Sequence, residues 1–584
     1  MKRWIPSFIA AVFYAAHPVH SDAVANIVGR AEILCCMFFL LSFLSFHSSI
    51  ESDPTDEIFD TSPSEIEQTA FRTVSWSRFL LSLVLADLSF FSKENGITVF
   101  GIFFIYDAIA LMRKLDYFKK VTRKNSAYNP LQRVLHSSSF HVIIRMGFCV
   151  LSALSLLLFR KFYIVRWQPL ISFVANPLKY SPLINNVLTI PYLHAYSAYL
   201  LAFPYHLVMD YSYNCIPMIE NFSDPRILLF LGFYLILISA TILGLLKRKW
   251  GLLVVIYCWI VLPFLPASQI LFPVGLLIIF FSFAFGFFFP DIKLKIKTGV
   301  LVGERLLYVP SLGFCFLLAM IFDQILRNKR AGFSRQYSIS FKSIAGFSTV
   351  LLIFVLYSIR TWNRNKIYVS EEVLFKNLME DCPNNARGPM FVGTVISNLK
   401  GTASANESLP YMLKSLEIYP RFAKALRHTG RLYGEMGEVE NSIKYYRKCL
   451  ESPDVPKQWN CHFGLIEQLF KKYKEEACDE IITLMEQAGK YANAFEGSLL
   501  NTGLCYLSKG RHKKAANVFM AYNARTQGGT PHSNAWLGDS FFSLGELERS
   551  KKSYQDALRF NNIKPSLKKH IEARLADISS KKTS

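Results

Sequence analysis

Ionisable residues crowd a short stretch between two apolar runs near the start of the chain. The stretch holds His17, His20, Asp22, Arg30 and Glu32. Charged groups at membrane depth cost free energy, so they tend to line a cavity or face a partner. An acid of this kind could accept a proton, and an arginine could bind a phosphate group. The alternative interpretation is that these residues only pair with one another or solvate an interface.

Further charges stand at the ends of other apolar runs. Lys93 and Glu94 follow one run, and Glu304 and Arg305 precede another. When all of these residues lie on one side of a membrane, they predict a site for an anionic ligand. In this hypothesis Arg305, together with Arg30, contacts a phosphate group.

A metal site is not favoured by the sequence. His17 and His20 are three residues apart, but no further ligand follows at a suitable spacing. The 11 cysteines lack the spacing of a zinc site, and their odd number leaves at least one thiol free. The cysteines do not decide the redox compartment, and their pairing stays open.

The elements that position these residues are predicted to be membrane helices. Hydrophobic residues make up 52% of the 584-residue chain, which excludes an ordinary soluble enzyme. The apolar runs suited to crossing a bilayer are Trp4–Ala16, Ala31–Phe46, Arg78–Phe91, Gly96–Leu111, His141–Phe159, Ile227–Leu246, Trp250–Leu265, Arg305–Leu326 and Ser343–Tyr357.

The orientation follows from three basic clusters beside these runs, at Arg113–Lys124, Lys247–Lys249 and Arg327–Arg335. Positive charge next to membrane spans usually marks cytoplasmic loops. Because the basic residues gather beside the spans, the net charge of +22 does not indicate nucleic-acid binding. The charged site residues and everything after Arg360 then lie on the side of the membrane away from the cytoplasm, called the far side below. The glycosylation sequons, at Asn221 and Asn406, fall there too.

Two apolar segments do not fit this count of crossings. Leu188–Met209 contains prolines and histidines, so we interpret it as lying along the membrane or re-entering it. Leu276–Pro290 would add one further crossing of the membrane, which does not agree with the orientation given by the basic clusters. We therefore predict that residues 276–300 are an insertion foreign to the working fold.

The last part of the chain is water-soluble and repeats with a period near that of tetratricopeptide repeats. Three phased copies are centred on Gly430, Gly503 and Gly538, each followed by aromatic residues. A degenerate copy is expected around Gly464, and a poor copy ends at Pro420. The segment after Lys564 is expected to form a capping helix. Solenoids of this type present a concave face that commonly binds extended peptide.

With these residues, the sequence resembles the transmembrane and tetratricopeptide-repeat O-mannosyltransferases, the TMTC family. The similarity covers nearly the whole chain, in order. The matching stretches are His17–Val24, Gly29–Leu34, Ser92–Val99, Pro266–Ser268, Gly303–Phe314 and Cys382–Ala386.

The resemblance implies an all-α chain, with a GT-C-like polytopic membrane domain over residues 1–359 and a lumenal tetratricopeptide superhelix over residues 360–584. It implies a protein of the endoplasmic reticulum membrane that moves mannose from dolichyl phosphate mannose, its donor lipid, to Ser or Thr of secretory or cell-surface proteins such as cadherins. No cofactor, metal or nucleic acid is implied.

By the same resemblance, Asp22 and Glu32 are the candidate catalytic residues, although each replaces the acid that is usual at its position by the other. We place them beside Arg30, where they orient the donor phosphate and could serve as a base. The candidate substrate-binding residues are His17, His20, Arg30, Lys93, Glu94, Glu304 and Arg305.

The sequence also departs from the family pattern. Family members begin with another span and a lumenal loop of paired acids, one of them taken as the catalytic base, and this chain starts after that loop. The family's Asp-Asn-Pro-Ala is here Ala175–Leu178. The expectation is that the chain transfers no mannose until its N-terminus is restored. The alternative function is a non-catalytic membrane scaffold that holds a client or chaperone through its repeats, and a transporter comes third.

Overall fold

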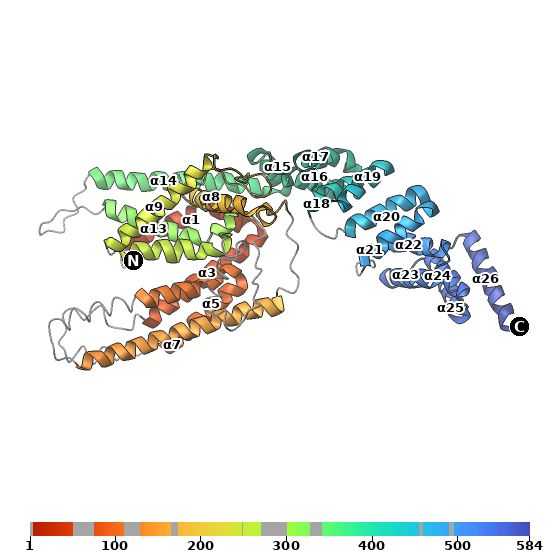
Figure 1. Ribbon diagram of the computed structural model, residues 1–584, viewed down its shortest axis with the longest axis horizontal. Helices are drawn as coiled ribbons and strands as arrows, with labels where there is room; N and C mark the ends of the chain where they lie inside the picture. Colours follow the sequence, from red (N-terminus) through yellow and green to blue (C-terminus); the bar gives the residue numbers. More distant parts are fainter. Residues whose placement is uncertain are drawn as a thin grey trace. The chain divides into compact units, whose positions relative to one another are not determined.

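A computed structural model describes most of the chain (Figure 1). The described residues are 4–50, 75–109, 129–164, 173–247, 249–269, 301–326, 341–454, 459–489 and 496–583. They form helices joined by turns, with no strand among them, which confirms the all-α fold class. The chain divides into two compact units, Met1–Pro383 and Asn384–Ser584.

The first unit is a bundle of apolar helices. Within the described residues, four helical segments are long and apolar enough to cross a membrane: Ile27–Ile50, His141–Phe159, Arg226–Leu246 and Ile344–Val369. Shorter apolar helices are Trp4–Ala16, Gly251–Ala267 and Pro310–Ile325. Each of these segments overlaps a predicted span, so the polytopic membrane unit is confirmed.

Two further predicted spans are helical in the structure. Arg78–Phe91 lies within α5 (Trp76–Ser92), and residues 98–109 form the helix after it. The segment Leu188–Met209 is helical in its first part, where α8 (Leu183–Ala202) contains Pro191. Its path relative to the membrane stays a prediction.

Several expectations lie outside the described residues. They are the basic clusters Arg113–Lys124 and Arg327–Arg335, and the proposed insertion at residues 276–300.

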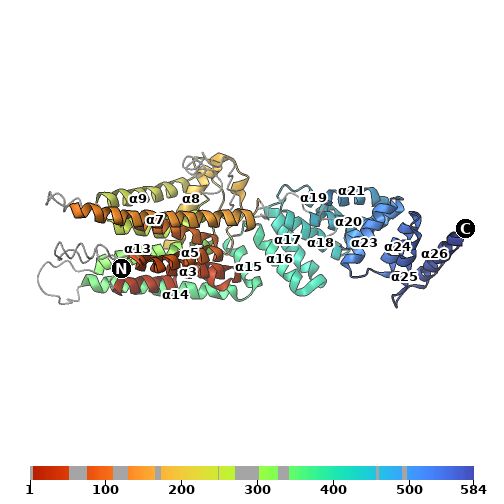
Figure 2. The same cartoon turned by 90° about the horizontal axis from the view of Figure 1, so that it is seen from below.

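The helices α3 (Arg30–Ile50) and α5 pack closely side by side (Figure 2). Small polar residues at the contact donate hydrogen bonds to the facing backbone: Ser42 Oγ lies 2.7 Å from the Ser82 oxygen, and Ser89 Oγ lies 2.9 Å from the Cys35 oxygen. Small residues of this kind let membrane helices approach closely. On another side of the unit, α1 (Trp4–Ala16) packs against α13 (Pro310–Leu326) and α14 (Phe341–Asn365).

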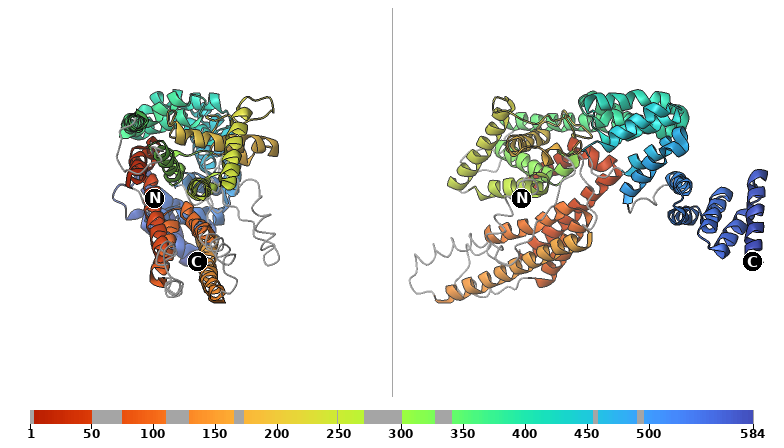
Figure 3. Two further views of the ribbon diagram at one scale, coloured as in Figure 1. Left: turned by 90° about the vertical axis from the view of Figure 1, so that its left-hand side faces the viewer. Right: turned by 45° about the vertical axis from the view of Figure 1, so that its right-hand side comes forward.

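The second unit is a row of helical hairpins followed by one last helix (Figure 3). Its helices are α16 (Arg387–Lys400), α17 (Ala405–Ile418), α18 (Ala423–Glu435), α19 (Val439–Leu450), α20 (Trp459–Tyr473), α21 (Cys478–Ala488), α22 (Glu496–Ser508), α23 (His512–Arg525), α24 (Pro531–Ser543), α25 (Leu547–Leu558) and α26 (Pro565–Thr583). The three phased copies and both irregular copies are therefore confirmed, as is the helix after Lys564.

The spacing of the repeat has a steric cause. A Cβ atom on Gly503 would lie 2.5 Å from the ring of Phe519, and one on Gly538 would lie 2.6 Å from the ring of Tyr554. In both hairpins, the aromatic ring on the second helix therefore fits only because the first helix has a glycine at the point of contact. A further glycine ends the first helix of each phased copy, with φ of +83°, +68° and +78° at Gly437, Gly510 and Gly545.

Candidate functional site

A tight double turn folds the first charged stretch back between α1 and α3. The His17 ring caps η1 (Pro18–His20) by accepting from the Val19 N–H at 3.3 Å. Next comes the short α2 (Ser21–Ala25). Gly29 then packs so close to Ala23 that a Cβ atom would lie 2.6 Å from its Cα atom. This turn buries both histidines and Asp22 at the edge of the bundle.

The two histidines are neutral hydrogen-bonding groups. His17 Nε2 lies 3.0 Å from the Leu201 oxygen, and His20 Nε2 lies 2.8 Å from Ser311 Oγ. Burial lowers the pKa of His17 to about 4, and burial together with the neighbouring His17 holds the pKa of His20 well below its usual value. Neither ring carries positive charge near pH 7, so any part they take in substrate binding is through hydrogen bonds.

Asp22 lies on α2, which packs against two elements that carry arginines from distant parts of the sequence. Its side chain is almost completely buried, and burial raises its pKa. Arg305 opposes this shift most strongly, and Arg364 contributes as well. Arg305 belongs to η9 (Glu304–Leu307), and Arg364 lies in the last turn of α14. The structure thus brings together the two predicted charged stretches that contain Asp22 and Arg305.

Glu304 is held on the other side of Arg364. Glu304 Oε1 accepts from the Tyr211 hydroxyl at 3.0 Å and from Arg364 Nη2 at 3.4 Å. Burial raises the pKa of Glu304 to about 7, although Arg364 opposes the shift. Both members of the pair are buried. Among the described residues, Glu304 Oε2 and Arg364 Nε have no hydrogen-bond partner, whereas Arg364 Nη1 forms an ion pair with Asp381 Oδ2 at 3.9 Å.

The remaining predicted residues form a neighbouring charged group. Lys93 Nζ lies 3.2 Å from Glu32 Oε1, and Arg160 Nη1 lies 3.6 Å from Glu94 Oε2. Arg305 is within electrostatic reach of both Glu32 and Asp22, so it connects this group to the first.

Arg30 stands apart from the cluster. It is the first residue of α3, its side chain is exposed, and it has no ion-pair or hydrogen-bond partner within the described part of the chain. Its contact with a donor phosphate stays a prediction.

Three residues of the cluster were missed by the sequence analysis, namely Arg364, Tyr368 and Tyr211. Arg364 and Tyr368 follow the last predicted span, one helical turn apart, and the Tyr368 hydroxyl is buried without a hydrogen-bond partner. An arginine one turn beyond an apolar run, on the same side as the other charges, was the available signal. Nothing in the sequence pointed to Tyr211.

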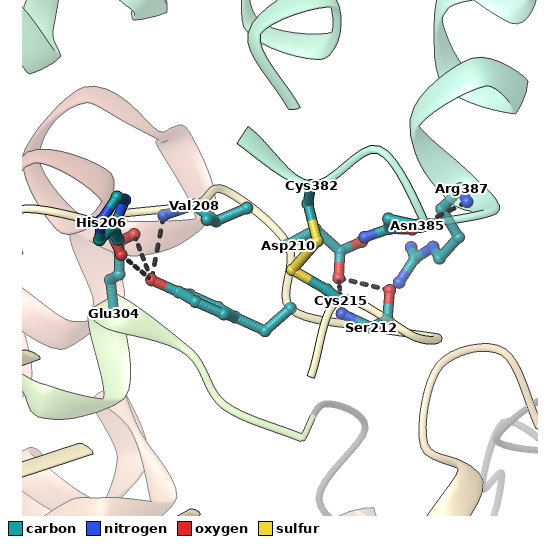
Figure 4. The surroundings of a disulfide bond; sticks show 10 residues. His206, Val208, Asp210, Ser212, Cys215, Glu304, Cys382, Asn385 and Arg387 are labelled. Atoms are coloured by element: carbon teal, nitrogen blue, oxygen red, sulfur yellow. Dashed lines mark hydrogen bonds between the residues drawn. A yellow bond between two sulfur atoms is a disulfide. The ribbon is translucent and has the colours of Figure 1, made fainter. Parts of the chain in front are cut away.

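A disulfide fastens the loop that carries Tyr211. Cys215, four residues further on, is bonded to Cys382, which caps α15 (Glu371–Asp381). Figure 4 shows the loop from His206 to Cys215 running from Glu304 to this disulfide. The second unit has two more disulfides, Cys449–Cys461 and Cys478–Cys505. The remaining cysteines are free and buried, all within the first unit: Cys35, Cys36, Cys149, Cys258 and Cys315.

Both units match known protein families. Residues 167–238, which include the Tyr211 loop, match the family described as protein O-mannosyl-transferase TMTC, DUF1736, and residues 428–453 and 531–563 match the tetratricopeptide repeat. Protein O-mannosyl-transferase TMTC1 of Mus musculus is 29% identical over 74% of this chain, and TMTC3 of the same species is 27% identical over 88%. Over most of its length the chain is similar to the TMTC proteins.

The similarity covers only part of each relative. The chain spans about half the length of the TMTC proteins it matches, 48% of mouse TMTC1, 51% of mouse TMTC3 and 48% of human TMTC4, to which it is 28% identical over 68% of its residues. Among solved structures, YrrB, titled a TPR protein with an unusual peptide-binding site, is 15% identical. It covers 34% of this chain with 97% of its own, at a TM-score of 0.30.

Proposed function

We propose that this chain belongs to the TMTC family and transfers mannose from dolichyl phosphate mannose to Ser or Thr hydroxyls of secretory or cell-surface proteins such as cadherins. The membrane unit would then have the GT-C architecture and lie in the endoplasmic reticulum membrane. The observation that carries the proposal is the buried cluster in which α2, with Asp22, packs against η9, with Arg305, and against α14, with Arg364. The names of the relatives supply the class of reaction.

The cluster suits this chemistry. In the transfer, the acceptor oxygen bonds to the anomeric carbon, the bond from that carbon to the phosphate breaks, and the hydroxyl proton passes to a base. Asp22 is the candidate base, since burial raises its pKa and thereby its affinity for a proton. Arg305 and Lys93 are the candidate partners of the departing phosphate, whose negative charge they stabilise. Glu32 holds Lys93 in place at 3.2 Å.

A lumenal position of the repeats is supported by the cysteines. Disulfides persist in oxidising compartments such as the lumen of the endoplasmic reticulum. All six bonded cysteines lie in segments that the orientation places on the far side, and the free cysteines lie in apolar helices. Both sequon asparagines are exposed, Asn221 in a loop and Asn406 in the first turn of α17.

This orientation predicts N-linked glycans on the expressed protein. Endoglycosidase H should increase the mobility of the wild type, and Asn221→Gln and Asn406→Gln should each remove the shift due to that sequon, because both lie on the lumenal side. A sequon introduced near residue 330, in the predicted cytoplasmic loop, serves as the control and should stay unmodified. Modification of the control sequon, with none at the natural sites, would reverse the orientation.

The activity is tested with purified protein, dolichyl phosphate mannose and an extracellular cadherin domain. Mouse TMTC1 serves as the positive control. Mannose on the acceptor, detected by mass spectrometry, is expected from both proteins. If this chain transfers no mannose while it retains the acceptor on a column, the non-catalytic scaffold becomes the better account.

A further inference from the structure

The loop that carries Tyr211 is held by contacts with other elements. Between the end of α8 and the start of α9, the chain forms no helix and no strand. At the start of this segment, the Tyr357 hydroxyl of α14 donates to the Ala202 oxygen at 3.2 Å. Further along, the disulfide joins Cys215 to Cys382 at the end of α15 (Figure 4). A segment with no regular structure of its own keeps one shape only where such contacts fix it.

The hydroxyl group of Tyr211 is oriented toward Glu304. The Tyr211 side chain is buried, and its oxygen accepts from the Val208 N–H at 3.0 Å. Of the two acceptors near the hydroxyl, Glu304 Oε1 is the closer at 3.0 Å, and the His206 oxygen lies at 3.3 Å. Because Tyr211 is only four residues from Cys215, a displacement of the cysteine would reach this hydrogen bond.

The other cysteine of the disulfide follows a partner of Arg364. Asp381 is the last residue of α15 and immediately precedes Cys382. Its Oδ2 atom lies 3.9 Å from Arg364 Nη1, and Arg364 Nη2 lies 3.4 Å from Glu304 Oε1. The disulfide therefore closes a ring of covalent and polar contacts, which runs through Cys215, Tyr211, Glu304, Arg364, Asp381 and Cys382.

This ring fixes a cation that acts on Asp22. The helix α14, which carries Arg364, packs against α2, which carries Asp22. Arg364 opposes the effect of burial on the pKa of Asp22, so it favours the ionised carboxylate. A general base must be ionised before it can accept a proton. The position of Arg364 therefore bears on the proposed role of Asp22.

The disulfide of the loop is more accessible than the other two. Cys215 is partly exposed, and Asn214 beside it is exposed. The four cysteines that form the disulfides of the second unit are completely buried. Thiol–disulfide exchange requires that a thiolate reach one of the sulfur atoms. A soluble dithiol should therefore reach Cys215 before it reaches the second unit's disulfides.

We propose that the Cys215–Cys382 disulfide is a redox-sensitive crosslink that positions the Glu304–Arg364 pair, and that opening it slows mannose transfer. The effect on transfer rests on the proposed function. In the opening reaction, a thiolate of a dithiol attacks Cys215 Sγ, the S–S bond breaks, and Cys382 leaves as a thiolate that takes up a proton. The second thiol then attacks the mixed disulfide and releases Cys215, so the dithiol becomes a cyclic disulfide and the protein gains two thiols.

The crosslink is tested by brief treatment of the full chain in detergent with dithiothreitol. Alkylation with iodoacetamide and mass spectrometry should find Cys215 and Cys382 modified while the cysteines of the second unit remain protected. Hydrogen exchange, measured before alkylation, should then be faster by about tenfold or more in residues 206–215, because a tether against local opening is lost. Reoxidation with oxidised glutathione should restore the slow exchange.

Two variants separate this effect from the general loss of a disulfide. Cys215→Ser/Cys382→Ser should show the faster exchange in residues 206–215 without any reductant. Cys449→Ser/Cys461→Ser is the matched control, since it also removes one disulfide, and it should leave exchange in that segment unchanged. Adding Tyr211→Phe to the first variant should have little further effect, because the crosslink and Tyr211 act on the same ion pair and their effects are not additive.

Transfer is measured on the same samples. Opening the crosslink should lower the maximal rate by about tenfold or more, since a displacement of about 1 Å near the reacting atoms can cost about 10²-fold. The KM for the donor should change less, because Glu32, outside the ring, holds Lys93. Dithiothreitol should have no further effect on the rate of Cys215→Ser/Cys382→Ser.

Three results would overturn the proposal. They are earlier opening of the second unit's disulfides, unchanged exchange in residues 206–215 after Cys215–Cys382 has opened, and an unchanged transfer rate in a chain whose segment has loosened. Hydrogen exchange requires no activity. A chain that transfers no mannose in any state therefore contradicts the proposed function, while exchange alone still decides whether the crosslink holds the loop.

Discussion

Replacing Asp22 by asparagine is expected to reduce the rate of mannose transfer by about 10²–10⁴-fold, the usual effect of losing a general base. Asparagine keeps the size of the side chain but cannot accept the proton of the acceptor hydroxyl. The measurement is the initial rate with saturating donor. Glu220→Gln, which removes an exposed acid from the loop before α9 (Arg226–Leu246), is the matched control and should leave the rate unchanged.

Two further variants separate catalysis from folding. Asp22→Glu restores a carboxylate at a displaced position and should recover part of the rate, whereas a purely structural role would make the larger residue as harmful as asparagine. Glu32→Gln should raise the KM for the donor by a larger factor than it lowers the maximal rate, since Glu32 positions Lys93 at 3.2 Å. A fully active Asp22→Asn protein would assign the base to another residue.

Replacing Arg364 by methionine is expected to destabilise the first unit by about 3–5 kcal/mol, as is typical when one partner of a buried ion pair is removed. Glu304 would keep Tyr211 as a donor but lose the cation at 3.4 Å. Thermal unfolding in detergent measures the loss. Lys366→Met is the matched control, because it removes an exposed cation two residues further along the chain.

A second substitution and the pH distinguish this cause from a general packing defect. Glu304→Gln in the Arg364→Met protein removes the uncompensated charge and should restore most of the stability. The raised pKa of Glu304, about 7 against 4.5, means that the folded state binds more protons than the unfolded state between these values. Stability from this group therefore falls as pH rises through that window, so the defect of Arg364→Met should be smaller at pH 6 than at pH 8. A defect that is independent of pH and persists in the double variant would contradict the ion-pair account.

The sequence by itself determined the elements whose signals are local. Apolar runs predicted the membrane helices because the thickness of the bilayer sets how many consecutive apolar residues a spanning helix needs. The repeats were predictable for the same reason, since Gly503 and Gly538 face aromatic rings on the next helix of the same hairpin. The charged residues of the site were also visible as charges at the ends of apolar runs, with Asp22, Glu32, Lys93 and Arg305 among them.

Only the tertiary structure decided which of these charges meet. Asp22, Arg305 and Arg364 come from three distant segments, and no spacing in the sequence relates them. The same holds for Tyr211 on Glu304 and for the bond between Cys215 and Cys382, which are 167 residues apart. Arg30 illustrates the converse, because it is close to Asp22 in sequence but exposed on its own. Helix formation depends on near neighbours, whereas the pairing of buried charges depends on how whole helices pack, and the packing of whole helices is a property of the complete fold.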